Sequence, residues 1–361
     1  MNLSLVLPSV RALLAIWLCL CSGACVERID FEVERTAGQL VVDGGFTNEE
    51  GIQRIRLGET VAVVRLPLPV EDAHVRLYED SGEFEDYVHD PEEPGTYLLH
   101  GTKIQGKPGH SYFVEITLAN GRVYRSKEEE MQPQQAMLDS IYYDFSLEKE
   151  ISSAGVVIEN TYINAYIDVE LSQLDRTTFL RWDVEEVFLL TPTDEPDPFG
   201  FVPPPCYVYQ YPSAIDLNLY DGSVNDIGRL EGLKVASQVL DWTFQEKHYF
   251  TVKQLGMNQE AFDYWDNVRD LLTNVGSIFD TPPAPLSGNV FNVNDSSEEV
   301  LGYFGVSSVS EIRFAVLRQD IPLDQVLECT YSQDKYYLDY PARCWDCLSV
   351  RNSTYTRPDF F

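Results

Sequence analysis

Basic residues are scarce in this chain of 361 residues, which has 26 lysines and arginines against 58 aspartates and glutamates. The resulting net charge of −32 repels phosphate backbones and anionic headgroups, so it excludes nucleic-acid binding and electrostatic adsorption to membranes as first interpretations. Aromatic residues, in contrast, make up 12% of the chain. Aromatic side chains suit pleated sheets, so the composition favours a mainly β protein, and the length favours two or three domains.

The sequence also lacks the common motifs of hydrolytic enzymes, namely a GxSxG nucleophile elbow and an HExxH zinc helix. Histidines are few and isolated: His74, His89, His100, His110 and His248. We therefore predict a non-enzymatic protein with no catalytic, metal or cofactor site. A catalytic triad built from residues distant in the sequence is the alternative.

Acidic residues crowd one segment around His89. They are Asp80, Glu83, Glu85, Asp86, Asp90, Glu92 and Glu93. Their spacing matches no EF-hand loop, so we interpret the segment as a solvated, negatively charged loop. Calcium binding by these carboxylates is the alternative.

The N-terminus has the pattern of an export signal. An apolar run from Ala12 to Leu20 is followed by small residues and then by Cys25. Small residues before a cysteine are typical of a lipobox, so we predict a signal peptide over residues 1–24, a lipidated Cys25 and a tether over residues 25–37. A plain signal peptide cut nearby is the alternative. No later run is long enough to span a membrane, so the lipid would be the anchor.

Four cysteines follow the predicted lipidation site, namely Cys206, Cys329, Cys344 and Cys347. An even number in an exported chain indicates two disulfides, for which three pairings exist. By elimination we predict that Cys206 pairs with Cys329 and that Cys344 pairs with Cys347.

Short alternating runs with turn signals between them fill residues 38–126, and Asn120-Gly121 is the strongest hairpin signal. This pattern predicts an Ig-like or transthyretin-like β-sandwich that folds alone. Polar residues 127–137 form the expected linker. Residues 138–361 are expected to form a larger β-rich domain with one or two helices, one of them near residues 260–275, where apolar residues follow a helical period.

A proline-rich loop over residues 192–205 leads into a run of alternating tyrosines. Proline stiffens the loop, and aromatic side chains offer contact area at a low entropy cost. We therefore predict that the aromatic residues of the loop and of the tyrosine run contact a partner or ligand. They are Phe199, Phe201, Tyr207, Tyr209 and Tyr211.

Several short motifs, in this order, resemble those of a known family. They include Leu40-Val41-Val42-Asp43-Gly44, Asp139-Ser140-Ile141-Tyr142-Tyr143, Phe279-Asp280-Thr281-Pro282-Pro283-Ala284-Pro285, Gly288-Asn289-Val290 and Cys344-Trp345-Asp346-Cys347. The chain is similar in this respect to the outer-membrane lipoproteins of Bacteroidota grouped as domain of unknown function 4249. The resemblance implies a surface lipoprotein encoded beside a TonB-dependent receptor, and it implies no activity for particular residues.

Together these observations predict a lipoprotein anchored in the outer membrane, at the cell surface, with the periplasmic face as the alternative. Its expected role is that of an accessory or ligand-capture partner of a TonB-dependent outer-membrane receptor. The competing hypothesis is an extracytoplasmic hydrolase or glycan-binding protein that acts alone.

Overall fold

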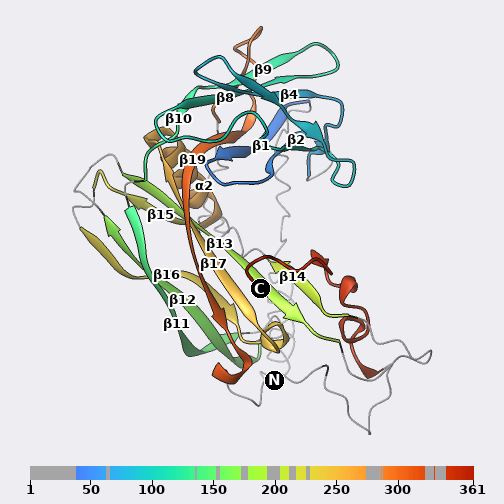
Figure 1. Cartoon of the computed structure of the whole chain (residues 1–361), viewed down its shortest axis with the longest axis vertical. Helices are drawn as coiled ribbons and strands as arrows, with labels where there is room; N and C mark the ends of the chain where they lie inside the picture. Colours follow the sequence, from blue (N-terminus) through green and yellow to red (C-terminus); the bar gives the residue numbers. More distant parts are fainter. Residues whose placement is uncertain are drawn as a thin grey trace, which may run out of the picture.

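The computed structural model describes residues 38–61, 66–134, 136–151, 155–171, 178–192, 204–210, 217–224, 228–273, 286, 288–321, 329 and 339–361. Strands dominate these residues, which confirms the predicted mainly β fold. The expected helix is present as α2 (Gln259–Thr273). Figure 1 shows two β units arranged along the long axis of the molecule and joined by the long strand β19 (Leu301–Val316).

The upper unit is a sandwich whose two sheets enclose one apolar core. Its first sheet contains β1 (Leu40–Thr47), β2 (Gln53–Glu59), β3 (Leu68–Pro69), β6 (Val88–His89) and β7 (Thr96–Leu99). Its second sheet contains β4 (His74–Glu79), β5 (Phe84–Asp86), β8 (Ser111–Thr117), β9 (Val123–Ser126) and β10 (Glu129–Glu130). The turn at Asn120-Gly121 joins β8 to β9, as its sequence predicted.

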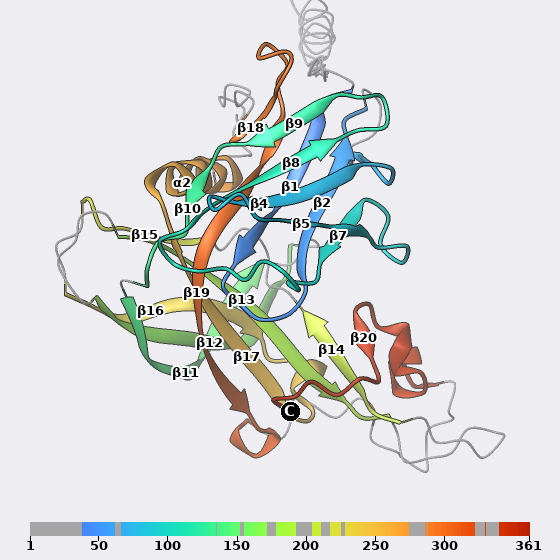
Figure 2. The same ribbon diagram turned by 45° about the horizontal axis from the view of Figure 1, so that its top comes forward.

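Two C-terminal segments complete this upper sandwich (Figure 2). Strand β18 (Val290–Asn292) pairs with β9, and the first half of β19 pairs in parallel with β1 from Val41↔Leu301 to Thr47↔Ser307. Phe304 and Val306 belong to the same core as the N-terminal strands. The sandwich is therefore not made of the continuous span 38–126 alone, because a parallel partner has to come from a distant part of the chain.

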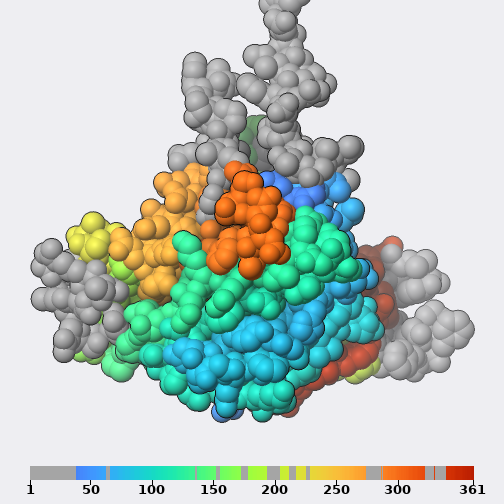
Figure 3. All heavy atoms as spheres, turned by 90° about the horizontal axis from the view of Figure 1, so that it is seen from above, coloured from blue at the N-terminus to red at the C-terminus, as the bar shows by residue number. Residues whose placement is uncertain are grey.

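The orange atoms of Figure 3, which include β18, lie against the strands of the upper sandwich at the surface of the molecule. Their position agrees with the pairing of β18 with β9. The segment that the sequence assigned to a second domain thus covers one edge of the first unit.

The lower unit continues the sheet that contains β1 and β19. The second half of β19 pairs with β17 (His248–Met257), which pairs with β13 (Phe179–Leu190). Strand β13 also pairs with β14 (Cys206–Gln210) and β15 (Asn218–Asp221), and β14 pairs with β20 (Ser353–Thr354). One sheet of 11 strands therefore runs through both units.

A second sheet of three strands packs on the lower part of this long sheet (Figure 1). It consists of β11 (Ala136–Ile151), β12 (Val157–Leu171) and β16 (Arg229–Val239). Trp182, Phe250 and Ile167 are buried in the core that the two sheets share. The short 3-10 helices are η1 (Trp242–Phe244), η2 (Arg318–Asp320), η5 (Ala342–Cys344) and η6 (Cys347–Ser349).

A buried hydrogen-bond network fixes β19 where it enters the upper unit. The Asn289 side-chain amide donates to Glu129 Oε1 and to the Phe304 carbonyl, both over 2.8 Å, and its oxygen accepts from Phe304 N–H at 3.0 Å. The Tyr303 hydroxyl also donates to Glu129. Burial raises the pKa of the Glu129 carboxyl, and these donors oppose that rise. Removing one member would leave buried polar atoms unpaired.

The closest approach between β1 and β19 needs glycine at position 302. Gly302 has a φ of +88°, and a Cβ there would lie 1.9 Å from the Val42 carbonyl oxygen. Gly121 has a similar φ of +83°, but no atom lies within 4 Å of its Cβ position. The two sites therefore share the backbone strain and differ in the steric clash.

Replacing these glycines separates the two effects. We expect Gly121→Ala to lower the free energy of unfolding by about 1 kcal/mol, the cost of a left-handed alanine. Gly302→Ala should lower it by about 3 kcal/mol or more, because the β1–β19 pair also has to move apart. Urea denaturation followed by circular dichroism measures both values. Equal losses in the two variants would contradict the importance of this contact.

Candidate functional site

Four of the predicted site residues lie outside the described part of the chain: Cys25, Phe199, Phe201 and Tyr211. The other two predicted contact residues, Tyr207 and Tyr209, lie on β14 with their side chains half-buried. Alternation along the strand places them on one face of the sheet, as their spacing predicted.

Tyr207 belongs to an aromatic face that the C-terminus completes. Its ring centroid lies 4.8 Å from that of Phe361, and the Tyr249 centroid on β17 lies 4.9 Å from Phe361 and 5.3 Å from Phe360. The Arg313 guanidinium lies 3.8 Å from the Phe360 centroid. Lys247 Nζ lies 4.7 Å from the Tyr249 centroid. We call this group of residues the aromatic face: Tyr207, Lys247, Tyr249, Arg313, Phe360 and Phe361.

No sequence pattern indicates where the C-terminal Phe360-Phe361 packs, so their contacts with β14 and β17 could not be predicted. Figure 1 shows the C-terminus beside these strands. Arg357 Nε donates to the Phe361 carbonyl at 3.0 Å, which holds the last turn of the chain in place. The aromatic face is therefore ordered within the chain itself.

The four late cysteines form two disulfides, which confirms their predicted oxidation, but the predicted pairing was wrong. Cys206 pairs with Cys347, and Cys329 pairs with Cys344. Cys344 ends η5 and Cys347 begins η6, so these two neighbours in the sequence face different partners. The first disulfide attaches the C-terminal tail to β14, directly beside Tyr207.

The acidic segment around His89 does not behave as one solvated loop. The Glu85 side chain is buried and accepts hydrogen bonds of 2.8–2.9 Å from the backbone N–H groups of residues 102–104. Burial by itself would raise the pKa of the Glu85 carboxyl, but these donors bring it below its usual value. Glu85 is therefore a structural anchor for the loop after β7.

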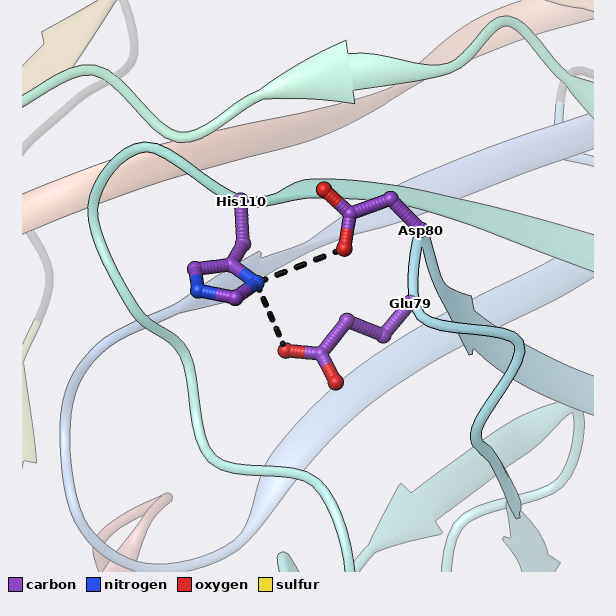
Figure 4. A group of neighbouring side chains, drawn as sticks. All are labelled: Glu79, Asp80 and His110. Carbon is purple, nitrogen blue, oxygen red and sulfur yellow. Dashed lines mark hydrogen bonds and ion pairs between the residues drawn. The ribbon is translucent and has the colours of Figure 1, made fainter.

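A different cluster brings two carboxylates of this region to a histidine, as Figure 4 shows. His110 Nδ1 lies 3.3 Å from Glu79 Oε1 and 3.3 Å from Asp80 Oδ1. The Glu79 side chain is 5% exposed, whereas the side chains of Asp80 and His110 are 39% and 43% exposed. Among the described residues, this is the one group of three such side chains whose ligand atoms converge within 4.8 Å.

Strand pairing explains why these three side chains meet. Glu79 ends β4, Asp80 follows it, and His110 directly precedes β8, the antiparallel neighbour of β4. The N–H group of Ser111 donates to Asp80 Oδ2 at 3.2 Å and, ahead of His110, lowers the pKa of that carboxyl. The cluster can hold one cation between its two carboxylates.

A second histidine–carboxylate pair is fully enclosed. His248 Nε2 lies 3.0 Å from Glu186 Oε2, and neither side chain is exposed by more than 1%. His248 Nδ1 lies 3.3 Å from the Thr243 carbonyl, and the ring stacks on Phe244 at 4.1 Å. Because both side chains are enclosed, we interpret the pair as part of the core.

Among the residues that the structure describes, no helix combines the length and the apolar character needed to cross a membrane.

Comparison with known proteins gives a family. The model of a family described as "Domain of unknown function (DUF4249)" matches residues 26–313. A search of curated proteins found no match.

Solved structures are only distantly similar. A DUF4785 family protein from Legionella pneumophila is 12% identical to this chain, with a TM-score of 0.20. The match covers 60% of this chain and 52% of the Legionella chain, which is about half of the latter. A tetra-tandem repeat in the extending region of a large adhesion protein is 11% identical with a TM-score of 0.16, over 62% and 71% of the two chains. The B domain of a biofilm-associated protein is 7% identical with a TM-score of 0.14, over 79% and 88%.

The disulfide pairing can be tested by peptide mapping without reduction. Cleavage on the N-terminal side of aspartate separates Cys344 from Cys347 at Asp346, so each linkage gives a distinct cross-linked peptide. We expect Cys206–Cys347 and Cys329–Cys344 linkages, and a peptide joining Cys344 to Cys347 would contradict the fold of the tail.

Cys347→Ser should free the Cys206 thiol and lower the free energy of unfolding by about 4 kcal/mol, because the lost bridge closes a long loop.

Proposed function

The chain belongs to the domain-of-unknown-function family DUF4249, and from this premise we propose that it is a non-enzymatic lipoprotein of the Bacteroidota outer membrane. Its proposed role is that of a surface accessory or ligand-capture partner of a TonB-dependent receptor. Four features of the chain support this role: its N-terminus, the aromatic face, the disulfides beside it, and the overall charge.

The N-terminal sequence supports membrane attachment through lipid. Small residues lead directly to Cys25, and an acyl group there would hold the mature chain at a bilayer without a spanning segment. The tether over residues 25–37 would give the folded part reach toward a neighbouring protein in the same membrane. Confinement to one surface raises the effective concentration of both partners.

The aromatic face is the observation that carries the proposed partner contact. Tyrosine, phenylalanine and arginine are enriched in protein interfaces, and here they lie together on β14, β17 and the C-terminus. The Cys206–Cys347 disulfide fixes the tail beside them. A contact on a surface that is already ordered loses little conformational entropy on binding.

The net charge of −32 adds a preference for a partner with a basic surface. Long-range attraction between opposite charges accelerates encounter and orients the two proteins, while the aromatic contacts determine the lifetime of the complex. We therefore expect salt to slow association more than it accelerates dissociation.

Lipid attachment is tested by Cys25→Ala. We expect the variant to move from the membrane fraction to the soluble fraction, because no acyl group is left to hold it. Partitioning is measured in carbonate-washed membranes against the unaltered chain. A variant that stays in the membrane would contradict attachment at this cysteine.

The partner contact is tested by co-purification from membranes solubilised in mild detergent. We expect a TonB-dependent receptor in the mass-spectrometric inventory, and we expect the combined variant Tyr207→Ala and Tyr249→Ala, which removes two rings of the aromatic face, to reduce its yield at least tenfold. Phe291→Ala is the matched control, because this aromatic side chain is 41% exposed on β18 of the upper sandwich.

Two outcomes would contradict the proposed contact. One is native protein that elutes without a TonB-dependent receptor. The other is a combined variant that retains as much receptor as the Phe291→Ala control.

A further inference from the structure

We propose that Glu79, Asp80 and His110 bind a divalent transition-metal ion, with zinc as the representative. The two carboxylates and the imidazole meet where β4 ends and β8 begins in the upper sandwich (Figure 4). This site is separate from the aromatic face, which lies on strands of the lower unit.

Two of the three distances within the cluster match those between the ligands of a bound zinc ion. Ligand atoms at zinc distances of about 2.0–2.2 Å and tetrahedral angles lie about 3.3–3.6 Å apart. His110 Nδ1 lies 3.3 Å from Glu79 Oε1 and 3.3 Å from Asp80 Oδ1. The two carboxylate oxygens lie within 4.8 Å of each other, so an ion can replace the Nδ1 proton and be coordinated by all three atoms after the side chains adjust.

Groups outside the cluster already orient both carboxylates. Ser81 Oγ donates to Glu79 Oε2 at 2.8 Å, and the Ser111 N–H donates to Asp80 Oδ2 at 3.2 Å. In each carboxylate one oxygen is thus held by a neighbour while the other faces His110, and Glu79 Oε1 also accepts from the Tyr112 hydroxyl at 3.3 Å. Partners of this kind orient ligands in metal sites and increase their affinity.

The backbone around the cluster is equally fixed. Asp80 N–H donates to the Ser111 carbonyl at 2.9 Å, and Met131 N–H donates to the His110 carbonyl at 2.9 Å. These bonds join the end of β4, the start of β8 and the segment after β10. The ligands therefore lie directly at the ends of two paired strands, which limits the entropy lost when an ion binds.

The ligand set favours a transition metal over calcium. An imidazole nitrogen with two carboxylates suits zinc and its neighbours, whereas calcium takes six or more oxygen ligands. Two carboxylates and a neutral imidazole together balance a divalent charge. Because His110 and Asp80 are partly exposed, water or a partner's side chain can supply the fourth ligand.

One cation competes for the same carboxylate. Lys107 Nζ lies 4.0 Å from Glu79 Oε1, and its side chain is 59% exposed. The lysine can leave toward solvent when an ion binds, but its charge opposes binding. Removing the Lys107 side chain should therefore strengthen metal binding. If His110 had only a structural role, this substitution would not change the affinity for the metal.

The test is calorimetric titration of the full mature chain, disulfides intact and metal removed by chelator, with zinc chloride. We expect one saturable site per chain, at least a tenfold weaker affinity in His110→Ala, and a several-fold stronger affinity in Lys107→Ala. His74→Ala is the matched control, because His74 Nε2 lies 3.0 Å from the single carboxylate of Asp86 in the same sandwich. This control should bind zinc like the unaltered chain.

Circular dichroism and the thermal midpoint of each metal-free variant separate binding from folding. Glu79→Gln serves as a second ligand variant that keeps the side-chain shape, and it should weaken zinc binding in the same way. The proposal is overturned by the absence of a saturable site. It is also overturned by equal affinities in His110→Ala and His74→Ala, or by a Lys107→Ala variant that binds no better than the unaltered chain.

Discussion

The parallel pairing of β1 with β19 is the interaction on which the rest of the structure depends. The first half of β19 supplies Phe304 and Val306 to the core of the upper sandwich, and the second half of β19 pairs with β17 in the lower unit. One strand therefore belongs to both units and holds them in a fixed relation. Because residues 41 and 301 have to meet, this contact closes nearly the whole chain, and it forms only after the C-terminal part is present.

Both candidate sites follow from this arrangement. The long sheet places β14 and β17 on either side of β13, so the side chains of Tyr207 and Tyr249 contact the C-terminal phenylalanines on one surface. The antiparallel neighbours β4 and β8 place His110 opposite the end of β4. In each site the backbone ladder, rather than a flexible loop, determines where the functional groups lie.

The local features of the fold could be predicted from the sequence, and the distant ones could not. Alternation in β8, the Asn120-Gly121 turn and α2 depend on residues close in the chain, and each was correct. The β1–β19 pair and the disulfide partners depend on which distant segments meet, and composition carries no signal for that. The same reason explains the metal cluster: Asp80 was placed beside His89, its neighbour in the sequence, whereas strand pairing brings it to His110.

The buried glutamates show why the cluster at Glu79 differs from a structural ion pair. Glu79, Glu85, Glu129 and Glu186 are all buried, so each needs donors to offset the loss of water. Glu85 and Glu129 receive neutral donors from the surrounding fold, and Glu186 meets a histidine that is itself enclosed. Glu79 accepts from the Ser81 and Tyr112 hydroxyls and, in addition, faces a histidine that reaches solvent. Of these four carboxylates, only Glu79 therefore has a partner that can exchange its proton for an ion from solution without opening the core.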